Sequence, residues 1–233
     1  MGRVIVVRHG QASIHKADYD QLSERGHGQS KTLGAWWADR GASFDAVFVG
    51  PAKRHRQTHA EVAAALELPE ARPLDGLAEH DAFGLVRAAL PVLADEPAMK
   101  PLQQALMGAG SPAERSAAFQ RVFELAMTRW LEGSLSPEGI EPWPHFRDRV
   151  QAAFDVLVAA SEGGRTVVAF SSVGPVAVML RQALGCSDLR AFETGWRLRN
   201  AALTEFRTGR GTPTLDRFNA VPHLTDPSTH TYR

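Results

Sequence analysis

The first hydrophobic run of the chain consists of four β-branched residues, Val4 to Val7. A short continuous apolar run of this kind is typical of a strand that is buried on both faces. The polar residues Arg8 and His9 and then Gly10 follow at once, so we expect the strand to end in a loop. Ligands of open α/β sheets bind at the carboxyl ends of the strands. This loop is therefore the first candidate for a functional site.

Strand-like and helix-like patterns then alternate along the chain. Residues 142–160, for example, carry apolar side chains at helical spacing, whereas residues 166–170 form another short apolar run. The order β, α, β, α, helical insert, α, β, α, β, β predicts an α/β fold with a mainly parallel central sheet between helices, in three α/β/α layers. We expect helices over about 23–40, 51–66, 142–160 and 173–184, and strands over 4–7, 44–49, 166–170, 202–206 and 215–218.

The chain is predicted to form a single domain. Its middle, residues 83–136, is predicted to be a helical insert that covers the strand ends. Its pattern is helical from Gly84 to about Trp130, with interruptions at three prolines and at the 108–112 break. The apolar residues of the insert are expected to pack mostly in its own core, and an apolar entrance to a site is the alternative.

Composition limits the kinds of partner that we expect. The 26 basic and 26 acidic side chains balance, so no overall basic surface for nucleic acid is predicted. No stretch approaches the roughly 18 to 20 consecutive apolar residues of a membrane span. The single cysteine, Cys186, agrees with a reducing compartment, and the first residues lack the apolar core of a secretory signal. We expect a soluble, cytoplasmic protein; its oligomeric state is not predicted.

A second group of cations follows the next predicted strand. Arg54 lies four residues beyond Gly50, where the first turn of a helix begins. Parallel strands end at one edge of the sheet, so Arg8 and Arg54 are expected to meet there and to bind a phosphate through forked hydrogen bonds. Lys53 and Arg56 are interpreted as a solvated part of the same basic turn.

Taken together, the segment that follows the first strand and the segment that contains Arg54 make the sequence resemble the histidine phosphatase superfamily, which includes phosphoglycerate-mutase-like proteins. Three family motifs appear in the family's order: an RHG tripeptide, a D-x-x-L-[ST] stretch followed by G-x-x-Q, and S-P-x-x-R-x-x-Q-T. Here they are Arg8-His9-Gly10; Asp20, Leu22, Ser23, Gly26 and Gln29; and Gly50-Pro51 with Arg54, Gln57 and Thr58.

The resemblance implies roles for the matching residues. His9 would be the nucleophile that becomes a phosphohistidine, Arg8 and Arg54 would hold the phosphoryl oxygens, and Gln11 is a further candidate contact. The family's general acid lies in an L-x-E segment, which Glu79 matches. Neither a metal nor another cofactor is expected.

The sequence departs from the family pattern at the end of a late strand. The family usually has a second catalytic histidine there, and alignment of strand and helix puts Ser172 at that position. Its hydroxyl and the following helix N-terminus still offer hydrogen bonds to a phosphate, but the positive charge is lost. After the RHG motif, the residues usually found are replaced by Ala12 and His15, and His15 is a possible substitute phosphate contact. Weakened rather than absent catalysis is the expectation.

A possible replacement for the missing imidazole is His223, which follows Pro222 after a predicted terminal strand. One interpretation places His223 in the site. The other leaves it in a tail that packs on the domain.

Three functions are compatible with these residues. The first is a metal-independent phosphatase that hydrolyses a phosphomonoester, either of a small molecule or of a phosphoprotein. The second is a phosphotransferase of the phosphoglycerate mutase type, which shares the same motifs. The third is a catalytically weak or silent relative that binds a phosphorylated ligand.

Overall fold

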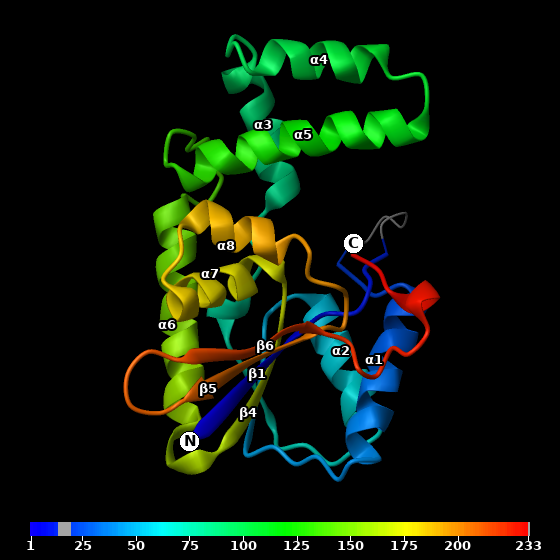
Figure 1. Cartoon of the computed structure of the whole chain (residues 1–233), viewed down its shortest axis with the longest axis vertical. Coiled ribbons are helices and arrows are strands. Elements are labelled where there is room, and N and C mark those ends of the chain that lie inside the picture. The colour runs from blue at the N-terminus through cyan, green and yellow to red at the C-terminus, as the bar shows by residue number, and fades with distance from the viewer. Residues whose placement is uncertain (14–19, 233) are drawn as a thin grey trace. The chain divides into compact units, whose positions relative to one another are not determined.

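The computed structural model describes residues 1–13 and 20–232 (Figure 1). The helices are α1 (Glu24–Ala38), α2 (Lys53–Ala63), α3 (Ala82–Leu93), α4 (Met99–Gly108), α5 (Pro112–Leu131), α6 (Trp143–Ala160), α7 (Val173–Leu184) and α8 (Asp188–Gly195). The strands are β1 (Gly2–Arg8), β2 (Ala46–Val49), β3 (Ala71–Pro73), β4 (Thr166–Ser171), β5 (Leu203–Thr208) and β6 (Thr214–Ala220).

The strands form one mixed sheet in the order β3-β2-β4-β1-β5-β6. The pairs β3–β2, β2–β4 and β4–β1 are parallel, and β5 and β6 continue the sheet as antiparallel strands. The predicted mainly parallel sheet is therefore confirmed. Since β1, β2 and β4 run the same way, the residues that follow them leave the sheet at one edge.

Helices cover the sheet on both faces (Figure 1). Ile5 and Val7 of β1 pack in a buried cluster with Leu33 and Trp37 of α1 and with Val62 of α2. The alternate residues of each strand point to the opposite face of the sheet. On that face, the ring of Phe206 in β5 contacts the ring of Phe154 in α6, with 4.9 Å between the centroids. The three-layer α/β/α arrangement follows from these contacts.

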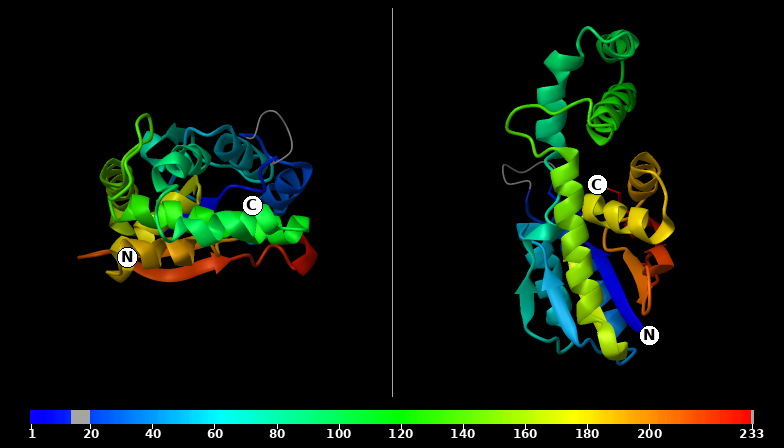
Figure 2. Two further views of the ribbon diagram at one scale, coloured as in Figure 1. Left: turned by 90° about the horizontal axis from the view of Figure 1, so that it is seen from above. Right: turned by 90° about the vertical axis from the view of Figure 1, so that its left-hand side faces the viewer.

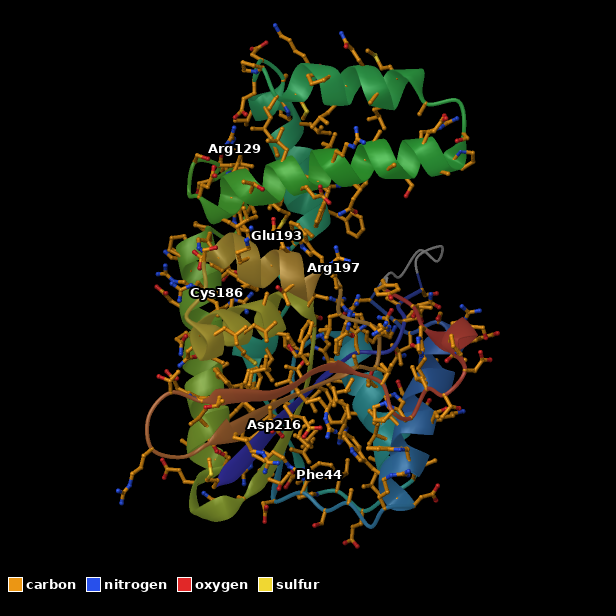
Figure 3. The ribbon with its side chains drawn as sticks, viewed as in Figure 1. Phe44, Arg129, Cys186, Glu193, Arg197 and Asp216 are labelled. Atoms are coloured by element: carbon orange, nitrogen blue, oxygen red, sulfur yellow. The ribbon has the colours of Figure 1, made fainter. Side chains whose placement is uncertain are left out.

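The chain divides into two compact units, residues 1–79 with 149–233 and residues 80–148. The second unit contains the predicted insert, 83–136, and extends three residues before it and twelve residues after it. Its core includes Trp130, which packs against Trp143 and Phe146 and stacks on His80. Arg129, labelled on α5 in Figure 3, forms an ion pair with Glu96 at 3.1 Å. The second unit therefore has its own packed interior.

Several elements differ from the expectations. The edge strand β3 was not predicted, because Ala71–Pro73 is short and ends in proline, a residue that sheets tolerate at an edge. Helix α8 was also missed. Pro91 is an expected interruption of the helical pattern, but α3 continues through it to Leu93, because this proline removes only the hydrogen bond of its own missing N–H and lies close to the end of the helix. Figure 2 shows these helices from two further sides.

Candidate active site

The candidate site lies in the first unit, at the edge where the parallel strands end. His9 follows β1, Gly50 follows β2, Glu79 comes shortly after β3, and Ser172 follows β4. The His9 N–H donates to the Ser171 carbonyl at 2.9 Å, which joins two of these loops directly. Topology therefore collects residues that are far apart in the sequence.

His9 is buried, and its surroundings favour the neutral imidazole. Its Nδ1 lies 2.7 Å from the Gly10 carbonyl oxygen. A carbonyl only accepts, so Nδ1 carries the proton and the lone pair of the neutral ring lies on Nε2. Burial lowers the pKa of His9 well below its ordinary value, and the charges of Arg54 and Arg8 lower it further. The ring is thus held in the state that a nucleophile requires.

Gly10 brings the His9 loop against the start of α1. A Cβ at Gly10 would lie 2.4 Å from the Gly26 carbonyl oxygen, so only glycine allows this approach. The Gly10 N–H donates to Thr58 Oγ1 at 3.0 Å, and the Thr58 hydroxyl donates to the Arg54 carbonyl at 2.8 Å. These two hydrogen bonds join the His9 loop to α2 and fix their relative positions.

The two predicted arginines lie in different surroundings. Arg54 Nη1 donates to Asp20 Oδ1 at 2.7 Å, while Asp20 Oδ2 accepts from the Lys53 N–H at 2.8 Å. Arg8 is buried and donates to two backbone carbonyls, those of Leu198 and Tyr232. Asp20 therefore orients Arg54 directly, and the C-terminal end of the chain helps to hold Arg8.

The C-terminal segment is tied to the same loops. Asn200 Nδ2 donates to the His9 carbonyl at 3.2 Å, and the Thr231 hydroxyl donates to Asn200 Oδ1 at 2.8 Å. Gln29 donates to Thr231 Oγ1 and accepts from the N–H of Gln11, the candidate contact beside the RHG motif. Gln11 Oε1 in turn accepts from the Ser23 hydroxyl. These polar bonds were not predicted from the sequence.

Glu79 and Ser172 meet at the start of α7. The carboxylate oxygens of Glu79 lie 3.1 and 3.2 Å from the Gly174 nitrogen and accept from its N–H. Ser172 is fully buried and is the residue that precedes the helix. A helix N-terminus favours negative charge, so this end of α7 suits both a carboxylate and a phosphoryl group.

Sequence reasoning missed His55. This residue lies in the first turn of α2, is fully buried, and places Nε2 at 2.6 Å from Ser172 Oγ. Its ring centroid is 5.7 Å from that of His9. Burial, followed by the charge of Arg54, lowers the pKa of His55 to about 3. Two features of the sequence point to it. His55 directly follows Arg54, and the same motif has Gly50 where the family has serine.

The two other candidate histidines do not join this group. His15 lies outside the described residues. His223 packs against Trp36, with 6.4 Å between the ring centroids. Trp36 is ten residues beyond Gly26 on α1, or about 15 Å along the helix at 1.5 Å per residue. Burial lowers the pKa of His223 to about 4, and within the described residues neither ring nitrogen has a hydrogen-bond partner. These contacts favour the packing interpretation.

The described part of the chain contains no group of three or more side chains suited to hold a metal ion. Within the same residues, no helix has both the length and the apolar character needed to cross a membrane.

The sequence and the fold are similar to those of known proteins. The model of the histidine phosphatase superfamily (branch 1) matches residues 4–87 and 109–221. Phosphoserine phosphatase from Entamoeba histolytica, solved as a mutant with phosphoserine, has a TM-score of 0.63 at 17% identity, covering 96% of this chain and all of that one. A mycobacterial glucosyl-3-phosphoglycerate phosphatase gives 0.62 at 19% identity, with 94% and 99% covered.

A third similar structure is phosphoglycerate mutase from Bacillus anthracis, with a TM-score of 0.61, 18% identity and coverage of 96% of this chain and 95% of that one. Among curated proteins, no sequence matches significantly. At these identities the solved structures establish a common fold.

Proposed function

The chain belongs to the histidine phosphatase superfamily, and on this premise we propose that it is a metal-independent phosphatase that hydrolyses a phosphomonoester through a phosphohistidine on His9. The observation that carries the proposal is the state of His9. Its Nδ1 proton is held by the Gly10 carbonyl, burial and the charges of two arginines lower its pKa, and the surroundings therefore favour the neutral ring. Such a ring presents Nε2 to a phosphoryl group that the arginines attract.

The proposed reaction has two steps. In the first, the His9 Nε2 lone pair forms a bond to phosphorus while the bond to the ester oxygen breaks, and Glu79 gives a proton to that oxygen. In the second, Glu79 takes a proton from water, whose oxygen bonds to phosphorus as the bond to Nε2 breaks. Phosphate leaves and His9 is restored. Division into two displacements lowers the barrier of each.

Small phosphomonoesters are the proposed substrates. The fold neighbours include an enzyme solved with phosphoserine and another named for glucosyl-3-phosphoglycerate, both of which are small phosphorylated molecules. A phosphoprotein is the alternative. A panel of phosphorylated metabolites and phosphopeptides, assayed for phosphate release, would identify the class.

The proposal is tested by phosphate release from an aryl phosphate in the presence of a chelator. We expect steady release that the chelator does not reduce. Phosphate transfer between positions of a phosphoglycerate that depends on a bisphosphorylated primer, without net release, would favour the mutase. Binding of inorganic phosphate without any turnover would favour the silent relative and reject the proposal.

Glu79→Gln tests the proton transfer. Glutamine retains the size of the side chain and can still accept from the Gly174 N–H, but it has no exchangeable carboxyl proton. General acid catalysis contributes about 10²- to 10⁴-fold, so kcat for an alkyl phosphate should fall within that range. An aryl phosphate with a good leaving group should lose less in the first step. Equal losses for both substrates in single-turnover phosphorylation would contradict the role.

A further inference from the structure

The buried pair formed by His55 and Ser172 has no function in the reaction described above. The two residues come from different elements, the first turn of α2 and the end of β4, and both are fully buried. The 2.6 Å separation of Nε2 and Oγ is that of a short hydrogen bond. A neutral polar pair of this kind is costly to bury unless its geometry is well matched.

Ser172 makes this bond in place of another that its position favours. A serine that precedes a helix usually accepts from a backbone N–H of the first turn, which typically stabilises the helix by about 1 kcal/mol. Within the described helix α7, the Ser172 hydroxyl accepts no such bond. Its oxygen is directed to His55 instead. The serine is therefore held for something other than helix capping.

Gly50 provides the space for the imidazole. A Cβ at this position would lie 2.3 Å from His55 Nδ1, closer than side-chain atoms approach one another. Gly50 follows β2 directly, so the end of that strand, the first turn of α2 and the end of β4 all meet around one ring. Gly50, His55 and Ser172 are therefore packed together around the imidazole.

The pair also lies where a phosphoryl group would bind. The charge of Arg54 acts on the rings of both His9 and His55, and the two ring centroids are 5.7 Å apart. A group held by Arg54 and bonded to His9 is thus beside the Ser172 hydroxyl. Phosphoryl oxygens only accept hydrogen bonds, so a hydroxyl that contacts them must donate its proton. Its own oxygen is then available to accept from a second donor.

We propose that His55 is a positioning residue of the site, which donates from Nε2 to Ser172 Oγ and thereby turns the Ser172 proton toward the phosphoryl group on His9. The second imidazole of this site accordingly comes from α2 and acts through a serine. This inference rests on the proposed phosphatase activity.

The test is a double-mutant cycle in which the rate of His9 phosphorylation is measured in single turnovers. His55→Leu fills the space but cannot donate, His55→Gln can still donate, and Ser172→Ala removes the hydroxyl. Because a hydrogen bond to a charged group is lost, each of His55→Leu and Ser172→Ala should slow phosphorylation by about 10- to 100-fold. The double variant should be no slower than the slower single variant. His55→Gln should retain most of the rate.

His59→Leu is the matched control, since His59 lies one turn further along α2 and its ring packs on Phe170. Its phosphorylation rate should stay within about twofold of wild type. Additive losses in the double variant, or a His55→Leu protein that is folded and fully active, would overturn the proposal. A His55→Gln variant as slow as His55→Leu would also overturn it.

A spectroscopic measurement keeps the inference testable if His55→Leu fails to fold. The ¹⁵N shifts of a neutral imidazole distinguish its two tautomers, and we expect the Nε2–H form for His55 in wild type with inorganic phosphate bound. The Nδ1–H form there would reject the proposed direction of the bond. Wild-type protein that releases no phosphate would reject the phosphatase proposal instead, and the tautomer would still decide the role of His55.

Discussion

Replacing His9 with alanine is expected to abolish turnover, lowering kcat by at least about 10⁴-fold, because the nucleophile is lost and the rest of the site cannot supply a covalent route. Wild-type protein quenched during turnover should carry a phosphoryl group that is labile in acid and stable in alkali. The alanine variant should carry none. Phosphate release and the chemical stability of the trapped group are the two measurements.

His145→Ala is a suitable control for this experiment, since His145 is exposed in the second unit and its replacement should leave both measurements unchanged. A His9→Ala protein that turns over at the wild-type rate would refute the mechanism. A trapped group that survives acid would also refute it, and would point to a hydroxyl such as that of Ser172 as the acceptor.

The sequence predicts those candidate site residues that directly follow one buried strand. The apolar run of β1 located His9, and the similar run of β4 located Ser172, because a buried strand gives a local signal that does not depend on its neighbours. Parallel strands then bring such ends together by topology alone. For the same reason, the short edge strand β3, which has no apolar run, was not predicted.

The role of His55 could not be predicted in this way. A histidine in a basic helical turn ordinarily faces solvent, and the burial of this one depends on a glycine at the end of β2 and a serine at the end of β4. The bonds from the C-terminal segment to Gln29 and Asn200 are similar, because they join residues that no local pattern relates. His223 is the candidate that the sequence suggests for the missing imidazole, whereas the ring at this edge of the sheet is that of His55 on α2.

Arg54→Ala is expected to lower kcat/KM by about 10²- to 10³-fold, because a forked charged donor contributes to binding and contributes more as charge develops on the phosphoryl oxygens. Arg54 is held by Asp20 at 2.7 Å and its side chain is only 12% exposed. Arg56 lies two residues further, is exposed, and donates to the Pro51 carbonyl. Residues two apart on a helix face different ways, so Arg56→Ala should change kcat/KM by less than twofold.

The pH dependence gives Arg54 a second, independent signature. His9 must be neutral to attack, and the Arg54 charge is one of the causes that lower the pKa of His9. Without that charge the pKa of His9 rises toward its ordinary value, so the imidazole becomes protonated at a higher pH as the solution is acidified. The acidic limb of kcat/KM, which reports groups of the free enzyme, should therefore move to higher pH in Arg54→Ala and stay in place in Arg56→Ala. If Arg56→Ala shows the larger loss and the shifted limb, the assignment of the phosphate-binding arginine on α2 is wrong, and the motif is displaced by two residues.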